Sequence, residues 1–309
     1  MLTCPMEILE QFPVRKSRTQ KEAFRTAVQS YADKLGYTVT LEKGQFGACN
    51  LLLGNPENAK FLVTAHYDTC AKMLLPNFIT PCNVIVYLVY QLGLVFLLMT
   101  GAVAAGVAAG LLFGSGAVKW TGLAVYWLLL FCLILGPANK YNANDNTSGV
   151  VTLLEIARTL PENQRHKVCF VLFDLEEAGL IGSASYRKKH KKATDRQLVL
   201  NLDCVGDGDH LMMFPTKKLR RNRKKLTSLY KACGYFGKKS LLVHEKGAAV
   251  YPSDQKQFPY GVGICALRKG KKLLYMSRIH TKKDTMLEET NVNILRAALT
   301  TFICRDEVN

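Results

Sequence analysis

Five short polar segments of the sequence carry side chains that could bind metal ions or move protons. The first is residues 64–69, TAHYDT, in which His66 and Asp68 are two positions apart. In an extended strand both would point to the same face. His66 could then bind a cation through one ring nitrogen, while Asp68 accepts the N–H of the other and fixes the tautomer. By itself the pair is weak, since a buried histidine with ordinary hydrogen bonds fits it as well.

The second segment, residues 142–149 (NANDNTSG), stands directly before a predicted helix. Asp145 could bridge two cations there, beside the positive end of that helix. A simple N-cap by Thr147 or Ser148 is the alternative. The segment, however, has more polar groups than one cap can use.

The third segment is an apolar run that ends in adjacent carboxylates, Glu176 and Glu177. Neighbouring side chains in an extended or turning backbone project differently, so one could bind a metal while the other acts as a general base. A solvated acidic loop is the alternative interpretation. An acidic pair at the end of a buried strand in a basic protein makes the two interpretations about equal.

The fourth and fifth segments supply Asp203, at the end of another apolar run, and His280, before the last predicted helix. Each is ordinary alone. In sequence order the set offers two histidines and three carboxylates for two cations, with one carboxylate left for proton transfer. Ligands of this kind bind zinc, and their oxygen-rich composition is also compatible with Mn²⁺ or Co²⁺.

Taken together, these segments resemble those of the M28 family of zinc peptidases, whose members use two co-catalytic zinc ions. TAHYDT, NANDNTSG, FDLEEAGLIGS, NLD and IHTKKDT occur in the family's order between about residues 61 and 285. The resemblance implies two Zn²⁺ ions that share Asp145. It assigns catalytic roles to Glu176, as general base, and to Asp68, as the partner of His66, and it assigns the metal ligands as follows: His66, Asp145 and Asp203 for one ion, and Asp145, Glu177 and His280 for the other.

The resemblance also implies metal-assisted hydrolysis of an amide bond and a strained peptide after Asp145. One departure concerns the region that shapes the pocket. Members of the family often have Ser-Asp-His followed by an aromatic residue, whereas this chain has Ser253, Asp254 and Gln255, with Phe258 after them. The departure affects the expected substrate preference and leaves the metal ligands unchanged.

The elements that must position these residues alternate between buried strands and amphipathic helices. Apolar runs predict strands over residues 59–66, 167–173, 197–202 and 261–267. Helical periodicity appears near residues 21–35, 148–160, 180–190 and 291–304. The sequence therefore predicts an α/β fold, zinc-exopeptidase-like by resemblance, with a mixed, mostly parallel sheet and helices on both faces. In such sheets ligands bind at the carboxyl ends of the strands.

One stretch does not belong to that pattern. From Met73 to Gly136 the sequence has a single charged residue, Lys119. Residues 84–113 and 118–135 are each long enough to cross a bilayer, and Gly114 to Gly116 would form the turn. We expect an inserted transmembrane helical hairpin, residues 76–136, within one catalytic domain, residues 1–75 and 137–309. Buried core helices are the alternative, and a third crossing would put the two halves of the domain on opposite sides of the membrane.

Charge and cysteine content bear on location. The chain has 41 Lys and Arg against 24 Asp and Glu, a formal net charge of +17. The positive-inside tendency places the catalytic domain in the cytoplasm of a multi-pass membrane protein, and ten scattered cysteines without a CxxC pair agree with a reducing compartment. Basic clusters at 187–192, 217–225 and 268–272 are expected to face anionic lipid. A solvated basic face is the alternative, and no nucleic-acid recognition motif accompanies the charges.

The leading hypothesis is a membrane-anchored dinuclear zinc metallopeptidase that acts on peptides, most specifically as an aminopeptidase. A related zinc amide hydrolase, such as a carboxypeptidase or a deacylase, would use the same metal ligands. An inactive membrane scaffold is the alternative outside enzymology, and the complete ligand set argues against it.

Overall fold

The computed structural model describes residues 2–73, 75–245 and 247–305. Both ends of the predicted catalytic domain, residue 1 and residues 306–309, lie outside this part. The strands are β1 Val39–Lys43, β2 Cys49–Leu53, β3 Phe61–His66, β4 Val168–Phe173, β5 Leu198–Leu202, β6 His210–Pro215, β7 Gly234–Phe236, β8 Lys239–Val243, β9 Gly261–Lys269 and β10 Leu274–Tyr275. The helices are α1 Ile8–Gln11, α2 Arg18–Lys34, α3 Val84–Phe113, α4 Gly116–Leu135, α5 Gly149–Thr159, α6 Ile181–Lys189, α7 Lys191–Thr194, α8 Lys217–Arg221, α9 Arg223–Leu229 and α10 Glu289–Arg305.

The strands form one mixed sheet in the order β1-β2-β4-β3-β5-β9-β6-β8-β7, with β10 added to β9. The four central strands, β4, β3, β5 and β9, run parallel. Antiparallel pairs complete both edges. Parallel neighbours bring their carboxyl ends to one edge of the sheet, so residues that follow β3, β4 and β5 meet there.

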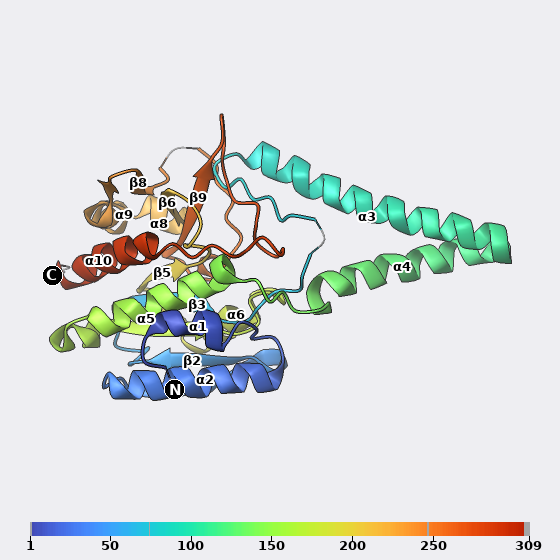
Figure 1. The fold of residues 1–309 in the computed structure, drawn as a ribbon. Helices are drawn as coiled ribbons and strands as arrows, with labels where there is room; N and C mark the ends of the chain where they lie inside the picture. The colour runs from blue at the N-terminus through green and yellow to red at the C-terminus, as the bar shows by residue number, and fades with distance from the viewer. Residues whose placement is uncertain (1, 74, 246, 306–309) are drawn as a thin grey trace.

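Helices cover both faces of this sheet (Figure 1). They are needed because successive side chains of β3 point to opposite faces and are all buried. Phe61, Val63 and Ala65 belong to the larger core, which includes residues of α2, α5 and α10. Leu62 faces the other way into a smaller core with Tyr186 of α6. The predicted α/β fold with helices on both faces is therefore confirmed. The predicted strands and helices agree with the structure to within a few residues, whereas six strands toward the edges of the sheet were not predicted: β1, β2, β6, β7, β8 and β10.

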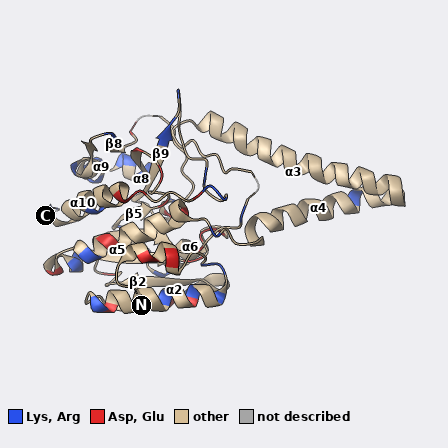
Figure 2. Ribbon diagram, viewed as in Figure 1, with Lys and Arg blue, Asp and Glu red and all other residues tan. Residues whose placement is uncertain are grey.

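The helices α3 and α4 project from the rest of the chain as an antiparallel pair (Figure 1). Both are long and apolar enough to cross a membrane, by length and composition. Neither is a core helix, because 11% of the most apolar window of α3 and none of that of α4 is buried. Figure 2 shows them almost entirely without charge. Most of the exposed large hydrophobic side chains among the described residues lie on these two helices.

Small residues allow α3 and α4 to approach each other closely. A Cβ added to Gly106 would lie 2.5 Å from the carbonyl oxygen of Val118, so a larger residue there would push the helices apart. Gly110 meets the side chain of the same valine, whereas nothing lies within 4 Å of a Cβ added to Gly101. Gly106 and Gly110 thus pack between the two helices.

Candidate metal centre

Four of the predicted site residues lie at or just after the ends of neighbouring parallel strands. His66 is the last residue of β3 and pairs in register with Phe173, the last residue of β4. Thr64 of β3 pairs with Asn201 of β5, which brings Asp203 to the same edge. The turn after β4 carries Glu176 and Glu177 toward this edge as well.

Asp145 reaches the same edge from a wide helical turn, residues 143–148, that leads directly into α5. All six residues of this turn are buried, and the peptide bond between Asp145 and Asn146 is cis. The turn lies against the end of β5, where a Cβ added to Gly149 would be 2.4 Å from the carbonyl oxygen of Leu202. Glycine at this position is therefore what lets the turn approach the sheet so closely.

The carboxylate of Asp145 lies between two histidines. Its Oδ1 is 3.2 Å from Nε2 of His66, and its Oδ2 is 2.9 Å from Nε2 of His280. Asp203 Oδ1 lies 3.7 Å from the same nitrogen of His66, and Glu177 Oε2 lies 3.5 Å from that of His280. The structure thus brings all five predicted ligands together, as two groups that share Asp145.

The donor atoms in this cluster fit metal ions. Ligand atoms of His66, Asp145 and Glu177 lie within 4.8 Å of one another, and so do those of His66, Glu176 and Asp203. Buried donor atoms are left over: Oδ1 of Asp203 and Oε1 of Glu177 have no hydrogen-bond partner among the described residues. Imidazole nitrogens and carboxylate oxygens are the ligands that zinc accepts alongside thiolates. The cluster therefore satisfies the chemistry expected of a centre for divalent cations.

The electrostatics of the cluster also favour bound cations, because several carboxylates are buried close together. Burial raises the pKa of Glu177 to about 8, with the nearby Asp145 adding to the shift. Burial opposes the charged form of His280, but Glu177 and Asp145 outweigh it and raise the pKa of that histidine to about 9. Divalent cations would relieve this crowding of carboxylates.

Glu176, the predicted general base, is half-buried beside this cluster. Burial raises its pKa well above the usual range, and Glu177 adds to the effect. Its backbone is fixed by Asp68, whose two carboxylate oxygens accept the backbone N–H groups of Glu176 at 3.0 Å and Glu177 at 3.2 Å. The predicted contact between Asp68 and Nδ1 of His66 is longer, at 3.5 Å. Within the described residues, Asp68 therefore hydrogen-bonds mainly to the backbone of Glu176 and Glu177.

Two buried charged residues that the sequence did not single out hold the cluster in place. The carboxylate of Asp284 accepts the backbone N–H groups of Asn144 at 2.7 Å and Asp145 at 3.1 Å. Its place four residues after His280 is the signal that could have revealed it. The guanidinium of Arg15 donates to the carbonyl oxygen of Tyr67 at 2.5 Å and to Oγ1 of Thr147 at 3.1 Å.

The segment that departs from the family pattern lies next to this centre. Asp254 is fully buried, and burial raises its pKa to about 7 while the nearby His66 opposes the shift. Gln255, at the position of the family's histidine, accepts from Nδ2 of Asn201 at 3.2 Å and donates to the carbonyl oxygen of Tyr251 at 2.8 Å. Its amide is thus used to tie this loop to β5.

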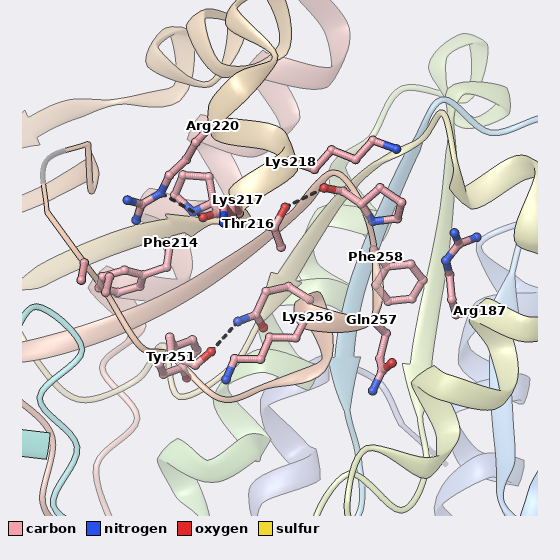
Figure 3. A pocket seen from close by; sticks show the side chains of 15 residues that line it. Arg187, Phe214, Thr216, Lys217, Lys218, Arg220, Tyr251, Lys256, Gln257 and Phe258 are labelled. Atoms are coloured by element: carbon pink, nitrogen blue, oxygen red, sulfur yellow. Dashed lines mark hydrogen bonds between the residues drawn. The ribbon is translucent and has the colours of Figure 1, made fainter. Parts of the chain in front are cut away.

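A cavity of 610 Å³ is lined in part by that loop (Figure 3). Its wall includes Gln255, aromatic side chains such as Phe214 and Phe258, and cations such as Lys217 and Lys218. None of the five predicted metal ligands lines it. This cavity is therefore separate from the metal centre.

Comparison with known proteins agrees with the fold and the motifs. The model of the family described as "Peptidase family M28" matches residues 130–302, more than half of the chain. Aminopeptidase YwaD of Bacillus subtilis (strain 168) is 40% identical over 67 residues, which is 21% of this chain and 15% of that protein. The matched region thus spans about one seventh of the length of this curated relative.

Solved structures with the same fold include two peptidases. A Zn-dependent exopeptidase from Parabacteroides distasonis ATCC 8503 aligns with a TM-score of 0.61 and 16% identity, over 97% of this chain and 95% of that one. The LapA aminopeptidase of Legionella pneumophila aligns with a TM-score of 0.58 and 14% identity, over 99% of this chain and 72% of that one. At these identities the likeness establishes the shared fold.

Proposed function

The chain belongs to peptidase family M28, and from this membership we propose that it is a dinuclear zinc aminopeptidase that removes residues from the free N-termini of peptides. One observation carries the proposal: the two carboxylate oxygens of Asp145 face one histidine each, His66 and His280. A carboxylate placed in this way suits a ligand shared by two cations. Asp203 would complete the set around His66, and Glu177 the set around His280.

Zinc ions bound there would acidify a water molecule and stabilise negative charge on the carbonyl oxygen of the scissile amide. The residues of the chain do the rest. Glu176 takes the proton of the attacking water and returns it to the leaving amine. Burial raises the pKa of Glu176, which makes it a stronger base than an exposed glutamate. Asp68 holds the backbone of Glu176 in position, and Asp284 does the same for Asp145.

The first experiment is the hydrolysis of a panel of aminoacyl amides by detergent-purified protein supplied with zinc, manganese or cobalt. We expect turnover by the wild type, and a loss of about a hundredfold to ten-thousandfold in Glu176→Gln with both metals retained. Turnover of N-blocked or acylated substrates alone would instead assign the site to a carboxypeptidase or a deacylase. A folded protein that binds no metal would support the inactive scaffold.

We further propose that α3 and α4 form a transmembrane hairpin, residues 76–136, inserted in a catalytic unit of residues 1–75 and 137–309. The proposal is supported by the exposed apolar surface of both helices and by their single charge, Lys119. Because the hairpin crosses twice, the two parts of the catalytic unit share one side, and the positive charge outside the hairpin favours the cytoplasmic side. The basic clusters of the catalytic unit would then face anionic lipid.

Labelling with a membrane-impermeant maleimide tests this arrangement in right-side-out and permeabilised vesicles. The exposed Cys4 reports the side of the catalytic unit. Ser115→Cys, in the turn between α3 and α4, reports the far end of the hairpin. We expect Ser115→Cys to react in intact vesicles and Cys4 only after permeabilisation. Reaction of both from one side, or release of the protein by alkaline carbonate, would exclude a spanning hairpin.

A further inference from the structure

A second cavity, of 770 Å³, lies between the start of the apolar hairpin and the metal centre. Its wall is made of three stretches of chain, of which Arg268 near the end of β9 is one. Lys72, Met73 and Pro76 come from the segment that leads into α3, and Thr281, Lys282 and Lys283 follow directly after His280. The five predicted metal ligands do not line it. An occupant of this cavity would therefore sit beside the metal centre, behind the His280 loop.

The cavity carries a large excess of positive charge. Five cations line it, namely Lys72, Arg268, Arg278, Lys282 and Lys283. The buried Asp207, which does not line the cavity, is the acidic partner of two of these cations, with its Oδ1 2.8 Å from Nε of Arg268 and its Oδ2 3.7 Å from Nη1 of Arg278. No salt bridge to the three lysines is formed within the described part of the chain. Five positive charges against one negative charge leave a site that suits an anion.

The wall of the cavity is joined to the first turns of the apolar hairpin. The hydroxyl of Tyr90, in α3, donates to the carbonyl oxygen of Pro76 at 2.5 Å. The ring of Phe78 lies 5.5 Å from the ring of Tyr90 and 5.5 Å from that of Tyr275. Aromatic side chains at the ends of spanning helices mark the level of the lipid headgroups. The cations of the cavity therefore lie where the headgroups of a bilayer around α3 would be.

We propose that this cavity binds the phosphate-bearing headgroup of an anionic membrane phospholipid. The inference rests on the proposed insertion of α3 and α4 into a membrane. A lipid is favoured over an acidic peptide substrate because the wall contacts a membrane helix through Tyr90 and contains no metal ligand. The headgroup would brace the His280 loop, since the backbone N–H of Met73 donates to the carbonyl oxygen of His280 at 2.7 Å.

The test uses the full chain in detergent, titrated with short-chain phosphatidylserine, short-chain phosphatidylcholine or inorganic phosphate, with the melting temperature as readout. We expect saturable stabilisation by phosphatidylserine and none by phosphatidylcholine. Lys72→Gln/Lys282→Gln should raise the half-saturating concentration of phosphatidylserine by about tenfold or more, since each cation near an anionic lipid contributes on the order of a fivefold gain. Lys34→Gln/Lys43→Gln, at exposed positions of α2 and β1 outside the three basic clusters, removes the same charge and should leave it unchanged.

Several results would overturn the proposal. These are an equal response to both lipids, equal weakening by the two double variants, or the same saturable shift with inorganic phosphate. Another is a raised KM for acidic peptides in Lys72→Gln/Lys282→Gln with the phosphatidylserine response retained, which would make the cavity a substrate subsite. Because the readout needs no catalysis, a protein that binds phosphatidylserine but hydrolyses nothing would remove only the proposed peptidase activity.

Discussion

Asp68→Asn tests whether the carboxylate behind the metal centre acts by positioning the general base. In the structure both oxygens of Asp68 accept backbone N–H groups, those of Glu176 and Glu177. An asparagine of the same size keeps one acceptor and turns an NH₂ group toward the other N–H. One of the two hydrogen bonds is therefore lost and replaced by a repulsive contact between donors.

The size of the effect follows from the charge of the acceptor. A hydrogen bond to a charged group contributes about 1.5–3 kcal/mol, and each ~1.4 kcal/mol of lost transition-state stabilisation is a tenfold loss in rate. If losing this hydrogen bond moves Glu176 out of its catalytic position, kcat falls by roughly tenfold to a hundredfold. KM should change little, because Asp68 is buried beneath the glutamate turn and away from the substrate.

The assay measures kcat, KM, bound metal and melting temperature for the wild type, Asp68→Asn and Glu42→Gln. Glu42 is the control because it is also a buried carboxylate, and its partners, His190 and Lys189, lie away from the metal centre. A kcat within about threefold of the wild type, at full metal occupancy, would refute the positioning role. Loss of a metal ion in Asp68→Asn would refute it too, because it would show that Asp68 acts through His66.

Three further predictions follow from the same structure. Asp284→Asn removes one of the two carboxylate oxygens that accept the backbone N–H groups of Asn144 and Asp145. Metal affinity, measured by calorimetry, should therefore fall by about tenfold or more. Glu42 raises the pKa of His190 above 6.5. Burial opposes the charged form of Glu42, but His190 and Lys189 together outweigh it and lower the pKa of Glu42 below 4.5. Their stabilisation is therefore complete between about pH 4.5 and 6.5. It declines as the pH rises through the folded pKa of His190 or falls through that of Glu42, and His190→Gln should lower the melting temperature more at pH 6 than at pH 9. Replacing residues 77–136 by a short linker should reduce turnover of membrane-associated peptides, and unchanged turnover of every substrate would reject a role of the hairpin in substrate access.

Much of the centre can be predicted from local sequence because its residues stand at the ends of strands. Apolar runs that stop at His66, Phe173 and Leu202 define β3, β4 and β5, and the polar residue that ends or follows each run lies at the carboxyl edge of a parallel sheet. The period of two along a strand also makes His66 and Asp68 candidates for one site. For these residues, sequence position and spatial position are linked by the fold class alone.

The residues that brace the centre have weaker local signatures: Asp284 stands four residues after His280, and Arg15 stands close to no predicted site residue. Arg15 and Thr147 are 132 positions apart, and Asp284 and Asn144 are 140 positions apart. A single buried arginine or aspartate looks like any surface charge until the fold supplies its partner. The edge strands escaped prediction for another reason: β1, for example, has one buried residue out of five, so it lacks a continuous apolar run.

The insertion of a long hairpin between two metal-binding motifs is explained by the neck that closes it. Ala71 and Ala138 form an antiparallel bridge, and the backbone N–H of Lys72 donates to the carbonyl oxygen of Pro137 at 2.8 Å. The chain therefore leaves and re-enters at one place, so the length of the insertion does not alter the distance between the motifs on either side. At the same neck, Nδ2 of the buried Asn139 donates to the carbonyl oxygen of Thr281 at 3.1 Å, directly after His280. Because packed and hydrogen-bonded groups transmit displacement, a movement of the hairpin would reach the predicted ligand His280 through this amide and through the hydrogen bond that the backbone N–H of Met73 donates to its carbonyl oxygen.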